Sequence, residues 1–137
     1  MIGTRKLIGI DTNVILRAVL QDDDHQSAIA NEMFQGLTAE RRGFITQVTL
    51  TETYWVLTRS VGISREESLE VIRRLVQTET LEFDDGESVV AALQAAEEGA
   101  DFADALIDAT MRTLGTTETV TFDRRASDRL GWRFLDA

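Results

Sequence analysis

Short apolar segments typical of buried strands alternate along this chain with longer segments that carry a helical apolar stripe. The predicted strands cover residues 5–10, 43–46, 81–83, 119–122 and 132–135. The predicted helices cover residues 14–20, 30–37, 50–61, 64–76, 89–96 and 103–114. Short apolar strands joined by helices favour parallel pairing, with helices on both faces of the sheet. We therefore predict an α/β fold, a single domain over residues 1–137 with a mostly parallel sheet.

The formal net charge of −10, taken alone, argues against a nucleic-acid partner. The acidic excess is confined to residues 66–108, which hold thirteen acidic and two basic side chains. Residues 1–65 hold seven of each sign, and residues 109–137 hold four acidic and five basic side chains. Every basic residue except Lys6 is an arginine, whose planar guanidinium matches phosphate in a bidentate manner. Nucleic acid would therefore have to meet a local basic surface.

Residue types that the chain lacks narrow its chemistry. It has no cysteine, which excludes disulfides, thiolate nucleophiles and zinc–thiolate sites. No phosphate-binding glycine motif and no Ser/His/Asp pattern is present. No apolar run approaches the ~18 residues of a membrane span, and the N-terminus lacks the apolar region of a signal peptide. We expect a cytoplasmic protein with no membrane partner.

Acidic residues stand where predicted strands end and helices begin. Asp11 follows the first strand, and Asp123 follows the fourth. In α/β folds, ligands bind outside the carboxyl ends of the strands. Asp104 lies at the start of the last long helix, and Glu52 lies off the apolar stripe of its own helix. In a doubly wound sheet these four positions can converge on one edge.

Carboxylates gathered at one edge repel each other and raise one another's pKa. A bound cation neutralises that repulsion, and a ligand set made only of oxygen favours Mg²⁺ or Mn²⁺. Such an ion orients a water and stabilises charge on phosphodiester oxygens. The pattern therefore predicts metal-dependent phosphodiester hydrolysis, although each aspartate taken singly also fits a helix cap or a solvated surface residue.

Other polar residues near these four have alternative interpretations. Asp101 is either the N-cap of the helix that starts at Phe102 or an outer residue of the site. Asp108, one helical turn after Asp104, is either an outer residue or a solvated one. His25 stands alone in a polar helix start and is interpreted as a surface residue.

Four segments resemble the PIN-domain family, and most closely its VapC-type toxins. Residues 8–16, IGIDTNVIL, look like the family's opening strand and turn, and residues 49–57, TLTETYWVL, look like its helix with the conserved glutamate. Residues 101–107, DFADALI, are similar to the third acidic motif, and residues 119–124, TVTFDR, are similar to the fourth. The order, the spacing and the chain length all agree with this resemblance.

The resemblance implies a three-layer α/β/α sandwich and an endoribonuclease that cuts RNA, typically tRNA or ribosomal RNA. It implies that Asp11, Glu52, Asp104 and Asp123 bind one or two Mg²⁺ or Mn²⁺ ions. It also implies a homodimer that a cognate antitoxin silences by folding over the active-site groove. Residues that match positions which shape the site by hydrogen bonding are Thr12, Asn13 and Thr121.

The basic residues next to the fourth motif are candidates for binding RNA. Arg124, Arg125 and Arg129 follow Asp123 in a segment of balanced charge, and Arg17 follows the first motif. We predict that these four contact the RNA backbone. We also expect the acidic residues 66–108 to face an arginine-bearing tail of the antitoxin.

Other classes of protein also place acidic residues at strand ends. A signalling receiver domain with an acidic Mg²⁺ pocket needs paired acids after the first strand and a lysine after the last, and this chain has neither. A haloacid-dehalogenase phosphatase needs Asp-x-Asp, and Asn13 occupies its second position. A structure-directed DNA nuclease of the same fold usually carries extra elements that 137 residues do not hold. A catalytically silent module that binds nucleic acid or protein stays open as an alternative.

Overall fold

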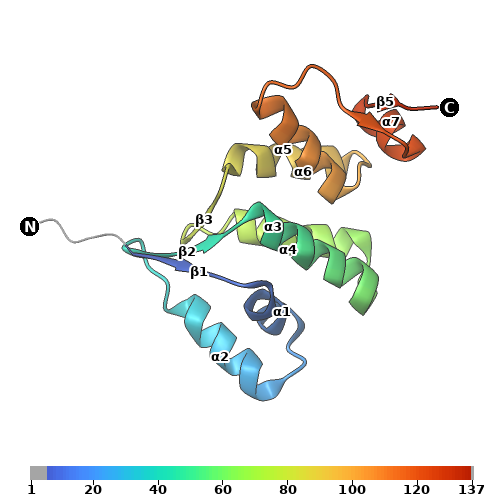
Figure 1. Cartoon of the computed structure of the whole chain (residues 1–137). Helices are drawn as coiled ribbons and strands as arrows, with labels where there is room; N and C mark the ends of the chain where they lie inside the picture. Colours follow the sequence, from blue (N-terminus) through green and yellow to red (C-terminus); the bar gives the residue numbers. More distant parts are fainter. Residues whose placement is uncertain (1–5, 137) are drawn as a thin grey trace, which may run out of the picture. The chain divides into compact units, whose positions relative to one another are not determined.

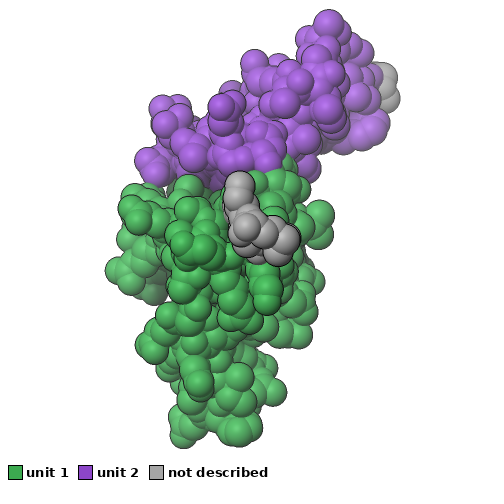
Figure 2. Space-filling view, turned by 90° about the vertical axis from the view of Figure 1, so that its left-hand side faces the viewer, with its two compact units in different colours: residues 1–84 green, residues 85–137 purple. Residues whose placement is uncertain are grey.

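The computed structural model describes residues 6–136. The chain divides into two compact units, unit 1 (Met1–Asp84) and unit 2 (Asp85–Ala137), coloured green and purple in Figure 2. Each unit contains parallel strands and the helices that flank them (Figure 1). We describe the two units separately.

Unit 1 alternates strands with helices in the order that the sequence predicts. Its elements are β1 (Lys6–Gly9), α1 (Thr12–Leu20), α2 (Asp24–Gln35), β2 (Arg41–Ile45), α3 (Gln47–Trp55), η1 (Val56–Val61), α4 (Arg65–Val76) and β3 (Leu81–Phe83). The strands form one parallel sheet in the order β1-β2-β3, with Ile8 opposite Gly43 and Gly43 opposite Leu81. The side chains that fill its core are Ile10, Ile15, Leu16, Ile45, Leu50, Tyr54, Leu57, Leu69 and Ile72.

Side chains cap the starts of helices α2, α3 and α4 in unit 1. The Ser64 hydroxyl accepts a hydrogen bond from the Glu67 N–H (3.1 Å) at the start of α4. Asp23 accepts from the Gln26 N–H in the same way at the start of α2. These caps satisfy amide groups that have no partner within the helix, so they set the helix boundaries.

The predicted helix over residues 50–61 changes its geometry partway along. The α-helix α3 ends at Trp55, and the wider π-helix η1 continues to Val61. The Thr58 hydroxyl donates to the carbonyl oxygens of Tyr54 (2.8 Å) and Trp55 (3.3 Å), so it occupies main-chain acceptors at this junction. Gly62 then ends the helix with φ +82°, a backbone conformation that favours glycine.

Unit 2 consists of a helix pair followed by a small parallel sheet. Its elements are α5 (Gly86–Glu97), α6 (Phe102–Thr113), β4 (Val120–Thr121), α7 (Arg124–Leu130) and β5 (Arg133–Phe134). Strands β4 and β5 pair in parallel, with Val120 opposite Arg133. Buried alanines and larger apolar residues fill the core of the helix pair: Val89, Ala92, Leu93, Ala96, Phe102, Ala105 and Leu106.

These elements confirm the α/β class, the parallel strands and the flanking helices that the sequence predicts. The first predicted strand begins at residue 5, which lies outside the described residues, and β1 covers Lys6–Gly9. Helix α7 was not predicted. The three-layer arrangement of the whole domain stays a prediction. Within residues 6–136, no helix is both long and apolar enough to cross a membrane.

Candidate metal centre

Asp11 lies at the junction of β1 and α1. It occupies the N-cap position of α1, where its backbone is extended (φ −84°, ψ 160°) and its carbonyl oxygen accepts from the Val14 N–H (3.1 Å). Its side chain is exposed and makes no capping hydrogen bond. The carboxylate of Asp11 is therefore not used to start the helix.

Glu52 is held in place from two directions in unit 1. Helix α3 begins after β2, where Thr46 caps it and the Asp84 carboxylate accepts from the Gln47 N–H (2.6 Å). The hydroxyl of Thr12, which is only 5% exposed, donates a hydrogen bond to Glu52 Oε1. Thr12 directly follows Asp11, so this bond links the first and second acidic motifs. Asn13 is exposed.

Asp104 lies in the first turn of α6, beside two other aspartates of unit 2. The side chain of Asp101 accepts a hydrogen bond from the Asp104 N–H (3.0 Å), so Asp101 is the N-cap of α6, as one of its two interpretations predicts. Partial burial raises the pKa of Asp104, and the negative charges of Asp101 and Asp123 raise it further. Two neighbouring negative charges therefore act on Asp104. Repulsion among all four predicted ligands stays a prediction.

Asp123 lies between β4 and α7. Its Oδ1 accepts from the Ala126 N–H (3.2 Å), which makes it the N-cap of α7. Its own N–H donates to the hydroxyl of Thr121 (2.9 Å). The sequence held a signal for this helix, since an aspartate cap at its start and Gly131 at its end are typical helix limits.

Asp108 does not share the surroundings of Asp104. Its side chain is 16% exposed, and both of its oxygens accept hydrogen bonds within unit 2. Trp132 Nε1 donates to Oδ1 (2.8 Å), and Arg112 Nε donates to Oδ2 (2.9 Å). Reasoning from the sequence missed the contact with Trp132, because the two residues lie 24 positions apart and no periodic signal joins them.

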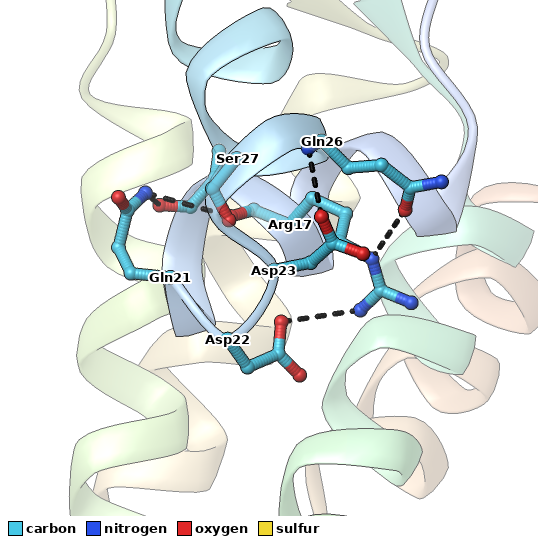
Figure 3. A network of polar contacts seen from close by, with 7 residues as sticks. Arg17, Gln21, Asp22, Asp23, Gln26 and Ser27 are labelled. Carbon is cyan, nitrogen blue, oxygen red and sulfur yellow. Dashed lines mark hydrogen bonds and ion pairs between the residues drawn. The ribbon is translucent and has the colours of Figure 1, made fainter.

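Arg17 belongs to a polar network at the turn between α1 and α2 (Figure 3). Its guanidinium donates to Gln26 Oε1 (2.7 Å) and to Asp22 (3.3 Å). Its carbonyl oxygen accepts from the hydroxyl of Ser27 (2.7 Å). Gln21, the C-cap of α1, has φ +53° and donates from its side chain to the Ala18 carbonyl (2.7 Å). These bonds stabilise the turn.

The three arginines that follow Asp123 have different surroundings. Arg124 stacks on the ring of Phe134, with its guanidinium carbon 3.7 Å from the ring centroid. Arg125 is exposed. Arg129 donates to the Glu98 carbonyl (3.4 Å). A stacked guanidinium keeps its edge open to phosphate, so Arg124 can still bind a phosphate group. Arg125 can do the same because its side chain is exposed.

The donor chemistry of these residues fits a hard divalent cation. All four predicted ligands offer carboxylate oxygen, and no cysteine is present to bind a softer metal. Asp11 and Glu52 belong to unit 1, and Asp104 and Asp123 belong to unit 2. Within residues 6–136, no three histidine or acidic side chains are grouped so that they could hold a metal ion. The convergence of the four carboxylates therefore stays a prediction.

The strands are parallel and flanked by helices, and carboxylates follow β1 and β4. The chain is therefore an α/β protein with acidic residues at strand ends. The model of the PIN domain family matches residues 8–131, a range that spans all four acidic segments, and the chain belongs to that family. Members of this family are typically metal-dependent nucleases, usually with Mg²⁺. None of the curated proteins compared with the chain matches it.

Proposed function

We propose that this chain is an endoribonuclease that depends on Mg²⁺ or Mn²⁺. The observation that carries the proposal is the family match over residues 8–131, within which each of the four motif positions holds a carboxylate. Asp11, Glu52, Asp104 and Asp123 are the proposed ligands of one or two ions. When bound, the ion supplies a polarised water for attack and positive charge for the phosphodiester oxygens.

The residues beside these carboxylates hold them in position. Thr12 donates to Glu52 and so fixes one of its oxygens. Asp101 and Thr121 accept from the main-chain amides of Asp104 and Asp123. Outer contacts of this kind orient metal ligands, and their loss typically costs metal affinity. Asn13 is proposed to act in the same outer layer.

The proposed substrate is RNA, with tRNA or ribosomal RNA as the expected targets. Arg124 and Arg125 support an RNA contact because both follow Asp123 and lie at the surface. Arg17 and Arg129 are weaker candidates, since hydrogen bonds within their own units already occupy part of each guanidinium. Phosphate contacts from these residues would offset the acidic net charge locally.

We further propose that the nuclease is the toxin of a VapC-type toxin–antitoxin pair and that it works as a homodimer. The resemblance of its four segments to such toxins supports this proposal. The acidic stretch over residues 66–108 offers a charged surface for an arginine-bearing antitoxin tail. Unit 1 also carries a groove of about 240 Å³ with an apolar lining that could receive apolar side chains of the antitoxin; it is lined by Ile15, Ala18, Val19, Asn31, Phe34, Gln35 and Leu75.

Incubation with total RNA tests the enzymatic proposal. Wild-type protein with Mg²⁺ should cut RNA at discrete sites, and either EDTA or the variant Asp11→Asn should abolish cutting. Equal cleavage in all three reactions would refute the metal mechanism. RNA binding without any cleavage would favour the catalytically silent module instead.

Expression in a bacterial host tests the proposed toxin role. Wild-type protein should arrest growth, and co-expression of the small protein encoded by the neighbouring reading frame should restore it. Asp11→Asn should not arrest growth. Arrest by the Asp11→Asn variant to the same extent would contradict a role that depends on nuclease activity.

A further inference from the structure

The carboxylate of Asp108 is joined by a hydrogen bond to the C-terminal part of unit 2. It lies on α6, one turn after Asp104, and accepts from the Trp132 indole at 2.8 Å and from Arg112 at 2.9 Å. Trp132 is 9% exposed, and its indole N–H donates to this partly buried carboxylate. Both oxygens of Asp108 are engaged in this way, which distinguishes it from the carboxylates proposed to bind metal.

Trp132 and the strand that follows it form hydrogen bonds with the segment that carries Asp123. Its carbonyl oxygen accepts from the hydroxyl of Ser127 (2.7 Å), which lies in α7. The strand that follows Trp132 pairs with β4, and Arg133 N–H donates to the Thr119 carbonyl (2.8 Å). Strand β4 leads into Asp123, and α7 starts from it. Trp132 therefore bonds directly to α7, and the strand that follows it in sequence pairs with β4.

A second contact joins the other end of α7 to the loop before α6. Arg129 donates to the Glu98 carbonyl (3.4 Å), and its guanidinium lies against Gly99. A methyl group added at Gly99 would meet Arg129 Nη1 at 2.8 Å, and Gly99 has φ +118°. Arg129 therefore joins α7 to the end of α5, whereas the bond between Trp132 and Asp108 joins the C-terminal segment to α6.

We propose that Asp108 is a positioning residue that acts through Trp132 to hold Asp123 beside Asp104. This inference rests on the proposed function, because it concerns two of the proposed metal ligands. It assigns Asp108 no contact with metal or RNA. Hydrogen-bonded partners of metal ligands typically contribute roughly 10–100-fold to metal affinity. We expect Asp108 to contribute indirectly, because it helps to hold the helix that Asp123 caps.

Three variants separate this role from a general effect on folding. Asp108→Asn keeps a carbonyl oxygen that can accept from the Trp132 indole, whereas Asp108→Leu removes the acceptor, and Trp132→Phe removes the donor. Glu118→Gln is the matched control, because it weakens the exposed ion pair with Arg133 (3.1 Å) at the same small sheet. Each protein is measured in two ways: amide hydrogen exchange over residues 124–131, and Mn²⁺ affinity from the electron paramagnetic resonance signal of the free ion.

Asp108→Leu and Trp132→Phe should speed exchange in α7 and weaken Mn²⁺ binding by about tenfold. In Asp108→Asn and Glu118→Gln, the Mn²⁺ affinity should stay within about threefold of the wild type, because the hydrogen bond between residue 108 and Trp132 is kept in both. Faster exchange with unchanged Mn²⁺ affinity would overturn the positioning role and leave Asp108 as a stabilising residue only. An equal loss in Asp108→Asn and Asp108→Leu would overturn the route through Trp132.

The two measurements also separate this inference from the proposed function. If wild-type protein binds no Mn²⁺, the proposed metal centre fails and the positioning role fails with it, whatever the exchange result. If wild-type protein binds Mn²⁺ and cuts RNA but all variants match it, the nuclease stands and only the role of Asp108 is overturned.

Discussion

Asp104 shows how a single residue can be costly to the fold and useful to the site. Burial, Asp101 and Asp123 raise its pKa in the folded chain above the ordinary value. The folded protein therefore binds this proton more tightly than the unfolded chain, and its stability falls as the pH rises through the raised pKa. A carboxylate that destabilises the metal-free fold is consistent with the proposed role of Asp104 as a ligand of a cation.

Replacing Asp104 by asparagine should therefore stabilise the metal-free protein at neutral pH. We expect a gain of less than ~1 kcal/mol, because Asp104 is only partly buried and solvent still screens the repulsion. Thermal unfolding in EDTA measures it, with Asp128→Asn on α7 as a control for the loss of one exposed charge. Added Mg²⁺ should raise the melting temperature of the wild type but not of Asp104→Asn. A less stable Asp104→Asn in EDTA would contradict this account.

Gly43 tests the packing of the sheet in unit 1. A Cβ at this position would meet Ile10 Cδ1 at 2.5 Å and Leu81 Cδ2 at 2.7 Å. Gly43→Ala should therefore destabilise the protein by about 1–3 kcal/mol through overpacking, as measured by denaturant unfolding. Gly9→Ala is the control, because a Cβ there has nothing within 4 Å. Equal stability of the two variants would show that the core around β2 yields more easily than this geometry implies.

At the scale of elements, the N-cap of α4 offers a clean measurement. The Ser64 hydroxyl accepts from the Glu67 N–H, so Ser64→Ala leaves that amide without its side-chain partner. The expected loss of stability is about 1 kcal/mol in urea unfolding. Ser60→Ala, at an exposed position in η1, should cost little. A loss of similar size in both variants would point to a general effect of removing a hydroxyl.

Elements with a strong apolar period could be predicted from the sequence, and elements that depend on local hydrogen bonds could not. Strands β1 and β3 lie within predicted segments. Strand β2 and the helices that carry Glu52 and Asp104 overlap predicted segments but begin one to three residues earlier. The change to a π-helix at Val56 depends on main-chain bonding that leaves no mark in the apolar pattern. Helix α7 is only seven residues long, with Ala126 as its one buried residue, so periodicity could not reveal it.

The same limit applies to the candidate site. The strand-end positions of Asp11 and Asp123 follow from alternation alone, because strand ends are where α/β folds bind ligands. The hydrogen bond from Thr12 to Glu52 joins residues 40 apart in sequence, and the bond from Trp132 to Asp108 joins residues 24 apart. Contacts of this kind depend on tertiary packing, which one sequence without a template does not specify.

At the scale of the whole molecule, the proposed RNA substrate carries the same sign of charge as the protein, so its binding would depend on a small basic surface. Arg125→Glu should weaken RNA binding and reduce the slope of log affinity against log salt by about 0.7, the value of one phosphate contact on a single strand. Arg41→Glu changes the net charge equally and serves as the control, and filter binding at several salt concentrations measures both. An identical change in the two variants would mean that overall charge, and not the residues after Asp123, governs binding.

The central proposal is that the carboxylates of Asp11, Glu52, Asp104 and Asp123 bind a divalent metal ion. Calorimetric titration with Mn²⁺ tests it on the wild type and on Asp11→Asn, Glu52→Gln, Asp104→Asn and Asp123→Asn, with Glu32→Gln and Asp128→Asn as exposed controls. The account predicts that all four site variants weaken Mn²⁺ binding by about tenfold or more, whereas both controls bind as the wild type does. Unchanged Mn²⁺ binding in any of the four site variants would contradict the proposed ligand set.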